Sequence, residues 1–247
     1  MSASTNNKLD LRVQSISYAA QDTYLVELCA VDGCVLPDAT PGAHIDLNLP
    51  NGITRSYSLV RADAQSHSYV VGIKKDAASR GGSRYVHEEL RVGTVLTVAG
   101  PRNHFPLHLS AQHSVLIAGG IGITPIWCMA QFLEQKGASW ELWYSVRTRA
   151  DAAFLKQIEA LGGKVHLHVD DEVGQVMDLQ AIITAADPGA HFYCCGPAPM
   201  LDAYEQAAAQ RDPETVHMER FAAKEAIALV RRVFGTYRQR AGDSRRL

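Results

Sequence analysis

The pattern of apolar and polar positions changes near residue 107. Before it, short runs of β-branched and aromatic residues alternate with polar ones, separated by Asp-Gly, Pro-Gly and Asn-Gly pairs. Such runs predict strands joined by tight turns. The six predicted strands cover residues 11–19, 23–30, 44–49, 55–60, 68–75 and 94–100. Their number and spacing predict a small antiparallel barrel, with one short helix over residues 83–90.

From residue 108 the pattern becomes that of a parallel sheet. Residues 114–120 form a continuous apolar run, typical of a strand buried on both faces. Strand-like and helical stretches then alternate. Further strands are predicted over residues 140–146, 164–169, 191–196 and 215–221, and helices over 125–135, 150–161, 178–186 and 198–210. This repetition predicts a doubly wound α/β domain with right-handed crossovers.

A third composition begins near the end of the chain. Seven Lys and Arg residues against two acidic ones give the last stretch a local charge of about +5. Charge blocks usually stay in water, so we expect a solvated, partly helical tail, with binding to an acidic partner as the alternative. We therefore divide the chain into a barrel (1–107), an α/β domain (108–223) and a basic tail (224–247).

The overall composition is that of a folded, nearly neutral protein. Hydrophobic residues make up 47% of the chain, and 24 Lys+Arg against 26 Asp+Glu give a net charge of -2. A nucleic-acid partner is not expected, because such proteins are usually basic. No apolar stretch approaches the ~20 residues needed to cross a bilayer, and the first residues lack the apolar core of a secretory signal. We expect a cytoplasmic protein with no membrane partner.

The five cysteines do not predict a disulfide framework, because their number is odd and Cys194 and Cys195 are adjacent. Cys29 and Cys34 have the spacing that opens a plant-type iron–sulfur motif, but Pro37 stands where the third cysteine is needed. We therefore expect no [2Fe–2S] cluster. Cys29 and Cys34 are interpreted as small thiols on a strand and its turn.

His166 and His168 share one face of a predicted strand, and Asp170 and Asp171 follow them. A metal site is conceivable, but two histidines on one strand lack further ligands at a recognisable spacing. We expect no metal. An exposed strand face and a ribose-binding loop are the preferred interpretations.

A glycine-rich turn follows the buried strand and contains Gly119, Gly120, Gly122, Thr124 and Pro125. Glycines let the backbone approach a pyrophosphate, and the start of the next helix offers free N–H groups. Pro125 suits a first helical turn but replaces the third glycine of the ordinary fingerprint. The turn predicts a dinucleotide site, with a tight strand–helix connection without ligand as the alternative.

The next predicted strand of the sheet ends without an acidic residue. Ser145, Arg147 and Arg149 stand there instead. On general grounds, arginines at this position favour a 2′-phosphate and therefore NADP.

A barrel strand carries Arg55 and Tyr57 on one face and Ser56 and Ser58 on the other. An arginine beside an aromatic residue can bind a phosphate while the ring packs on a planar cofactor. A surface pair is the alternative.

The segment from Arg80 through Gly81 and Gly82 to Ser83 offers a guanidinium, two flexible residues and a hydroxyl at a helix start. It is a candidate second phosphate cradle, and an ordinary turn with a serine cap is the alternative.

Cys195, Gly196 and Pro197 lie at the carboxyl end of a predicted parallel strand, where open α/β sheets bind ligands. Buried packing is the alternative for the thiol, because cysteine is among the most buried residue types.

The order of these motifs resembles that of the ferredoxin–NADP⁺ reductase superfamily. Within it the resemblance is closest to reductases of the phthalate dioxygenase and vanillate demethylase type. The motifs are R-x-Y-S from Arg55, R-G-G-S from Arg80, P-R-N-x-F-P-L over 101–107, A-G-G-I-G-I-T-P over 118–125, C-G-P from Cys195, and E-x-F from Glu219 to Phe221.

The resemblance implies that the barrel binds FMN and the α/β domain binds NADH. By motif, the FMN site would consist of Arg55, Tyr57, Ser58, Arg80, Gly81, Gly82 and Ser83. The dinucleotide site would consist of Gly119, Gly120, Gly122, Thr124, Pro125, Ser145, Arg147, Asp171, Cys195, Gly196 and Pro197. Phe221 would lie against the flavin ring, and Ser58, Cys195 and Phe221 would be the residues at the reacting atoms.

The resemblance further implies an NADH-dependent reductase that supplies electrons to an aromatic-ring oxygenase or O-demethylase. It ends near Lys224, before the [2Fe–2S] domain that such reductases usually carry, so we expect a separate oxygenase or iron–sulfur protein as acceptor. Alternatives are an FAD-containing, NADPH-linked ferredoxin or flavodoxin reductase, a regulatory electron-delivering subunit, and a remnant without activity.

Overall fold

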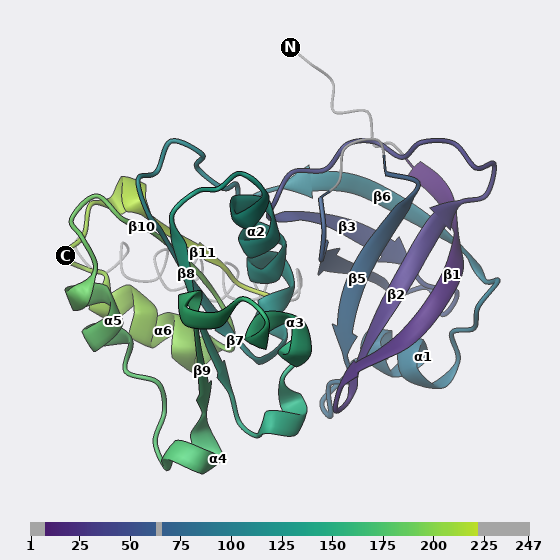
Figure 1. Cartoon of the computed structure of the whole chain (residues 1–247). Coiled ribbons are helices and arrows are strands. Elements are labelled where there is room, and N and C mark those ends of the chain that lie inside the picture. The colour runs from purple at the N-terminus through teal and green to yellow at the C-terminus, as the bar shows by residue number, and fades with distance from the viewer. Residues whose placement is uncertain (1–7, 63–65, 222–247) are drawn as a thin grey trace, which may run out of the picture.

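An antiparallel sheet of six strands forms the first part of the computed structural model, which describes residues 8–62 and 66–221. Its strands are β1 (Lys8–Ala20), β2 (Thr23–Ala30), β3 (Ala43–Asn48), β4 (Thr54–Ser58), β5 (Ser68–Lys74) and β6 (Val95–Asn103), in the order β4-β3-β6-β1-β2-β5. Leu59 forms a bridge with Val71, and the Val60 amide donates to the Val70 carbonyl at 2.9 Å. These contacts close the sheet into the predicted barrel (Figure 1).

Alternating side chains fill the barrel. Val26, Leu28, Ile45 and Leu47 are fully buried in its core. Helix α1 (Gly82–Glu88), which begins one residue before the predicted helix, adds Val86 to the same core. The barrel is thus a packed unit with its own apolar interior.

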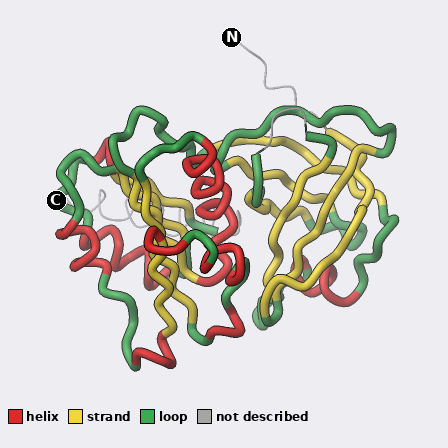
Figure 2. The backbone as a smooth tube through the Cα atoms, viewed as in Figure 1, coloured by secondary structure: helices red, strands yellow, loops and turns green. Residues whose placement is uncertain are grey.

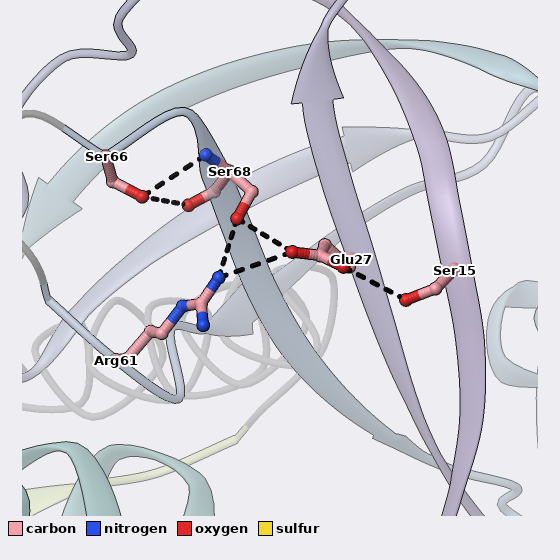
Figure 3. Close-up of polar contacts among 5 residues, drawn as sticks. All are labelled: Ser15, Glu27, Arg61, Ser66 and Ser68. Carbon is pink, nitrogen blue, oxygen red and sulfur yellow. Dashed lines mark hydrogen bonds and ion pairs between the residues drawn. The ribbon is translucent and has the colours of Figure 1, made fainter.

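A polar network ties the strands together on the barrel's flank (Figure 3). Glu27 of β2 accepts hydrogen bonds from Ser15 of β1 at 3.1 Å and from Ser68 of β5 at 2.9 Å. Arg61 donates to Ser68 at 2.6 Å and to Glu27 at 3.3 Å. The Ser66 hydroxyl donates to the Ser68 carbonyl at 2.6 Å. The network fastens the segment that follows β4.

The second part of the chain forms a five-stranded parallel sheet. Its strands are β7 (Ser114–Gly119), β8 (Trp140–Val146), β9 (Val165–Val169), β10 (His191–Cys195) and β11 (Val216–Glu219), in the order β11-β10-β7-β8-β9. The chain runs outward from β7 to β9 and returns to add β10 and β11 on the other side. The switch between β7 and β10 is the place where open α/β sheets bind ligands. The doubly wound fold class is confirmed.

Helices cover both faces of this sheet (Figure 2). They are α2 (Ile123–Gln135), α3 (Leu155–Glu159), α5 (Leu179–Ala185) and α6 (Ala198–Ala207), while the short helix α4 (Asp170–Val173) directly follows the end of β9. One apolar core joins α2 and α3 to the face turned toward the barrel, and another joins α5 and α6 to the opposite face.

Apart from other shifted ends and the unpredicted helix α4, two differences from the prediction bear on the site. The helix expected over residues 150–161 is split into a 3-10 turn (Arg149–Asp151) and α3, because Phe154 adopts a left-handed backbone with φ 61. Its ring stacks on Trp127, with centroids 5.8 Å apart, and this tertiary contact accompanies the break. The last predicted strand ends at Glu219, so Phe221 follows β11 instead of lying within it.

In the described part of the chain, no helix is long and apolar enough to cross a membrane. The predicted domain boundary at 107 falls in the connection between β6 and β7. The predicted basic tail, residues 224–247, lies outside the described residues.

Candidate functional site

The barrel packs against the edge of the parallel sheet at which the strands end. Val60 and Phe105 join the apolar core that contains the inner face of α2. At Gly72 of β5, an added Cβ would lie 2.6 Å from Cγ2 of Thr124, at the start of α2. Thr124 is 2% exposed, and its hydroxyl donates to the Ile121 carbonyl at 3.1 Å. The predicted nucleotide turn thus lies directly against the barrel.

A hydrogen bond between Ser58 and Glu219 crosses this junction. The Ser58 hydroxyl, at the end of β4, donates to Glu219 Oε2, at the end of β11, at 3.0 Å. Burial raises the pKa of Glu219 to about 7, although the Ser58 hydrogen bond opposes the shift. A carboxyl with this pKa can hold or release a proton near neutral pH.

Cys195 is the neighbour of Glu219 in the paired strands β10 and β11. It is fully buried, and burial raises the pKa of its thiol well above the ordinary value. The thiol therefore stays neutral, and it is not an activated nucleophile. Its place at the strand's carboxyl end agrees with the predicted position, and its burial agrees with a packing role.

The glycines of the predicted nucleotide turn have different roles. A Cβ at Gly122 would lie 2.1 Å from the Cys195 carbonyl oxygen, and one at Gly119 would lie 2.4 Å from Met200 Sδ. A Cβ at Gly196 would lie 2.7 Å from the same sulfur. These three glycines let the end of β7 and the turn after it pack closely against the end of β10 and against Met200 of α6. Gly120 is different, because its φ is +51 and its Cβ position faces open space.

The remaining residues of this edge lie nearby in the fold. Pro125 is buried in the first turn of α2. Pro197 is exposed and caps the start of α6. Phe221 is 48% exposed just beyond Glu219. An exposed aromatic side chain beside a domain junction is available to cover a planar group.

Arg55 lies over the start of α1. A Cβ at Gly82 would lie 2.8 Å from Arg55 Cγ, and Gly81 has a φ of +103. Arg55 donates to its neighbour's carbonyl at 2.9 Å and forms no ion pair with any residue in 8–62 or 66–221. Burial raises the pKa of nearby Tyr57 to about 12, so its phenol stays neutral. The structure brings these predicted FMN residues together.

Ser83 and Arg80, the other two residues of the predicted phosphate site, belong to the turn before α1 and its first residues. The Ser83 hydroxyl accepts from the Asp76 amide at 3.1 Å and donates to Ser79 at 3.0 Å, so it holds the preceding turn. Arg80 is exposed in that turn. The Ser83 hydroxyl therefore stabilises the turn before α1, which agrees with the alternative of an ordinary turn at this segment.

The ends of β8 and β9 form a third group of predicted residues. Ser145 donates to Asp170 at 3.2 Å, and the Asp171 amide donates to the Arg147 carbonyl at 3.1 Å. The Arg147 side chain and Asp171 are exposed. Arg149, in contrast, is bound by Glu172 through two hydrogen bonds of 3.0 and 2.9 Å. These two segments are held together by both backbone and side-chain bonds.

The residues fit a flavin phosphate and a dinucleotide. Arg55 has no carboxylate partner among the described residues and lies at a helix start where a Cβ at Gly82 would collide with it. Gly120 presents backbone to open space at the switch point of the sheet. Both features leave room and charge for an anionic group.

Glu219 was missed as a site residue, although it belongs to the E-x-F motif. The available signal was its spacing: it precedes Phe221 by two positions, which places both on one side of an extended chain.

Within the residues that the structure describes, no cluster of three or more His, Cys, Asp or Glu could hold a metal ion. His166 instead stacks on Trp143 at 3.9 Å, and His168 bonds the Gln175 carbonyl at 2.8 Å.

Comparison with known proteins gives three kinds of match. The family model of the oxidoreductase NAD-binding domain matches residues 116–206. The chain is 52% identical over 228 residues to the phenoxybenzoate dioxygenase subunit beta of Ectopseudomonas oleovorans, covering 92% of this chain and 71% of that protein. It is 41% identical over 219 residues to the vanillate O-demethylase oxidoreductase of Pseudomonas putida, covering 87% and 69%.

Two solved structures have the same arrangement of elements. Phthalate dioxygenase reductase matches with a TM-score of 0.82 and 34% identity, over 88% of this chain and 69% of that one. An intact type IV self-sufficient cytochrome P450 monooxygenase matches with a TM-score of 0.83 and 36% identity, over 88% of this chain and 28% of that one.

Proposed function

The chain belongs to the phthalate dioxygenase reductase type of the ferredoxin–NADP⁺ reductase superfamily, and from this premise we propose that it is an NADH-dependent FMN oxidoreductase. Its electrons would go to an aromatic-ring dioxygenase or O-demethylase, either directly or through a separate iron–sulfur protein. Relatives named as a dioxygenase subunit and an O-demethylase oxidoreductase support this acceptor class.

The observation that carries the proposal is the bond between Ser58 and Glu219. It joins the strand of the R-x-Y-S motif to the strand of the E-x-F motif, across the junction of barrel and sheet. A reductase of this kind must hold two planar rings in contact, one from each domain, and a junction between domains is where such a site is built.

The residues divide the work of binding and orientation. Arg55 and the turn at Gly81 and Gly82 would hold the FMN phosphate, with Tyr57 beside the flavin. Gly120 and Thr124 would receive the dinucleotide at the start of α2. The bound flavin would supply the chemistry itself, accepting a hydride from the reduced nicotinamide and passing the electrons on.

The junction residues would control water and protons. Buried Cys195 keeps one side of the junction apolar, and exposed Phe221 can shield the other. Ser58 holds Glu219 at a fixed position through the hydrogen bond that its hydroxyl donates to Oε2. Since burial brings the pKa of Glu219 to about 7, that carboxyl can hold or release a proton at the junction.

The absorption spectrum of the purified protein after incubation with FMN tests the proposal. We expect a yellow protein that bleaches anaerobically with NADH and releases FMN on denaturation. A protein that takes up no flavin would overturn the proposal.

Replacement of Arg55 by Ala tests the phosphate site separately. We expect FMN affinity to fall about tenfold or more, because a phosphate would lose a charge-assisted partner. Arg12→Ala, at an exposed position of β1, is the matched control and should retain FMN. Equal flavin retention in both variants would exclude the phosphate role of Arg55.

Exposed Arg147 favours the alternative of an NADPH-linked, FAD-containing reductase, because a guanidinium at the end of β8 could accept a 2′-phosphate. Identification of the released flavin, and comparison of NADH with NADPH turnover, distinguish the two.

A further inference from the structure

Arg149 is held by carboxylates immediately after β8. Its Nε donates to Glu172 Oε1 at 3.0 Å and its Nη2 to Glu172 Oε2 at 2.9 Å, while Nη1 donates to Glu159 Oε1 at 3.4 Å. The pair with Glu172 is bidentate, the geometry in which a guanidinium also binds a phosphate. Glu172 therefore occupies the edge of Arg149 that a phosphate would use.

The backbone that carries Arg149 is fixed independently of this pair. The Gln21 amide of the barrel donates to the Ala150 carbonyl at 2.8 Å. Lys74 of β5 pairs with Asp151 at 2.8 Å, and Asp151 also accepts from the Thr148 hydroxyl at 2.9 Å. Loss of Glu172 would consequently free the Nε and Nη2 edge of Arg149, leave the longer contact of Nη1 with Glu159, and not release the segment.

The pair of Arg149 and Glu172 lies where it can affect the choice between NADH and NADPH. In doubly wound sheets the segment after the second strand meets the adenosine ribose, and an arginine there accommodates a 2′-phosphate. Here β8 is that strand, and the carboxylates Asp170, Asp171 and Glu172 follow the adjacent strand β9. A 2′-phosphate would meet negative charge and an arginine already in use.

We propose that Glu172 determines the preference for NADH over NADPH by withholding Arg149 from the 2′-phosphate. This inference rests on the proposed function, because it concerns the coenzyme of that reaction. Glu172 acts through Arg149, so it is a specificity-determining residue and takes no part in the chemistry.

The test compares Glu172→Gln with the wild-type protein in two measurements. The first is the ratio of kcat/KM for NADPH to kcat/KM for NADH. The second is calorimetric binding of adenosine 2′,5′-bisphosphate and 5′-AMP, which requires neither flavin nor turnover. We expect Glu172→Gln to raise the NADPH/NADH ratio about tenfold, and the bisphosphate affinity relative to 5′-AMP by a similar factor.

Two further variants identify the cause. Glu172→Gln combined with Arg149→Ala should lose the gain, because the freed guanidinium would be absent. Glu214→Gln, which removes one exposed charge before β11, should leave both ratios unchanged, because the strand order places it at the opposite edge of the sheet.

An unchanged ratio in Glu172→Gln would overturn the inference. A gain that persists in the double variant would also overturn it, because simple repulsion by Glu172 would then explain the preference. Failure of the proposed function looks different: the wild-type protein would bind 5′-AMP yet take up no flavin or leave NADH unoxidised. In that case the bisphosphate measurement still decides the role of Glu172, and absence of any adenosine binding would exclude both proposals.

Discussion

Glu219 combines a partly buried carboxyl with a hydrogen bond between distant parts of the chain. Burial raises its pKa from 4.5 to about 7, so between these values the folded protein binds a proton that the unfolded chain releases. The contribution of this protonation to stability is complete below about pH 4.5 and is lost as the pH rises through 7. A tenfold change in proton affinity corresponds to about 1.4 kcal/mol, and partial exposure reduces the effect, so we expect a loss of about 2 kcal/mol.

Glu219→Gln should abolish this loss, because an amide keeps the acceptor for Ser58 and does not titrate. The free energy of unfolding, measured in urea at about pH 5 and about pH 8, should fall with pH in the wild-type protein by about 2 kcal/mol more than in the variant. Glu214→Gln, at an exposed position, controls for the change in net charge. The same pH dependence in all three proteins would show that Glu219 titrates normally.

The sequence motifs located most of the candidate residues but not their contacts. Arg55 and Gly82 are 27 positions apart, and their motifs already suggested a shared phosphate site. Ser58 and Glu219 are 161 positions apart, and no local pattern indicates that β4 and β11 end at the same place. The pairing of Arg149 with Glu172 was likewise hidden, because it depends on the adjacency of β8 and β9.

In the connection from β7 to α2, close packing leaves room for no side chain at Gly122. Gly122 has an ordinary right-handed backbone, φ -59, so alanine is conformationally acceptable there. A Cβ would nevertheless lie 2.1 Å from the Cys195 carbonyl oxygen of β10. Gly122→Ala should therefore destabilise the protein by about 2–4 kcal/mol through overpacking alone.

Thermal unfolding measures this effect. Gly163→Ala is the matched control, because nothing lies within 4 Å of its Cβ position. We expect a clear fall in Tm for Gly122→Ala and little change for Gly163→Ala. Similar Tm values for the two variants would show that the turn after β7 can move away from the end of β10 at no cost.

Three histidines connect β10, β11 and the segment that precedes β7. The ring of His217 stacks on Tyr193 and on His108 with centroids 4.6 Å apart, and His191 Nδ1 lies 3.1 Å from His217 Nε2. Burial, with the neighbouring His108 and His191, lowers the pKa of His217 from 6.5 to about 4. The unfolded chain therefore binds more protons than the folded one between these values, and stability falls as the pH drops through 6.5.

His217→Phe should remove this acid sensitivity while keeping an aromatic ring against Tyr193. When the pH is lowered from about 7 to about 5, the free energy of unfolding measured in urea should fall by about 1–2 kcal/mol more in the wild-type protein than in the variant. Glu219 changes stability in the opposite direction over part of this range, so the comparison between variant and wild type is the informative quantity. Parallel curves for the two proteins would exclude a depressed pKa at His217.

Element prediction succeeded where burial alone decides the pattern. After Ser114 the residues of β7 are apolar, and the whole strand is buried, as its composition predicted. It failed over residues 150–161, where a regular helical pattern is interrupted at Phe154. The Tyr144 hydroxyl accepts from the Ala153 amide at 3.2 Å, and Asp151 bonds to Lys74 of the barrel. Such tertiary partners override local propensity and leave no trace in the local sequence.

At the scale of the whole molecule, the two sheets are joined by one apolar core and a few polar contacts. Val60 and Phe105 of the first part lie in the core of the second, and Gln131 of α2 donates to the Val60 carbonyl at 2.9 Å. Lys74 adds an ion pair with Asp151 at 2.8 Å. The apolar core joins the two parts, while the ion pair and the bond from the Gln21 amide to the Ala150 carbonyl hold the segment after β8 against the barrel.

Lys74→Met should loosen this orientation without unfolding either part. Its neighbour Lys75 pairs at an exposed position with Glu88 of α1 at 2.9 Å, so Lys75→Met removes the same charge without touching the junction. Because a partly exposed ion pair stabilises by at most about 1 kcal/mol, we expect FMN retention and Tm to change little in both variants.

The rate of flavin reduction by NADH should fall about two- to fivefold in Lys74→Met only, since ring contact depends on domain angle. Stopped-flow reduction at low and high salt measures this; the wild-type rate should fall with salt toward that of Lys74→Met, because screening weakens the pair. Equal rates in Lys74→Met and Lys75→Met would mean that the apolar core alone fixes the domain arrangement.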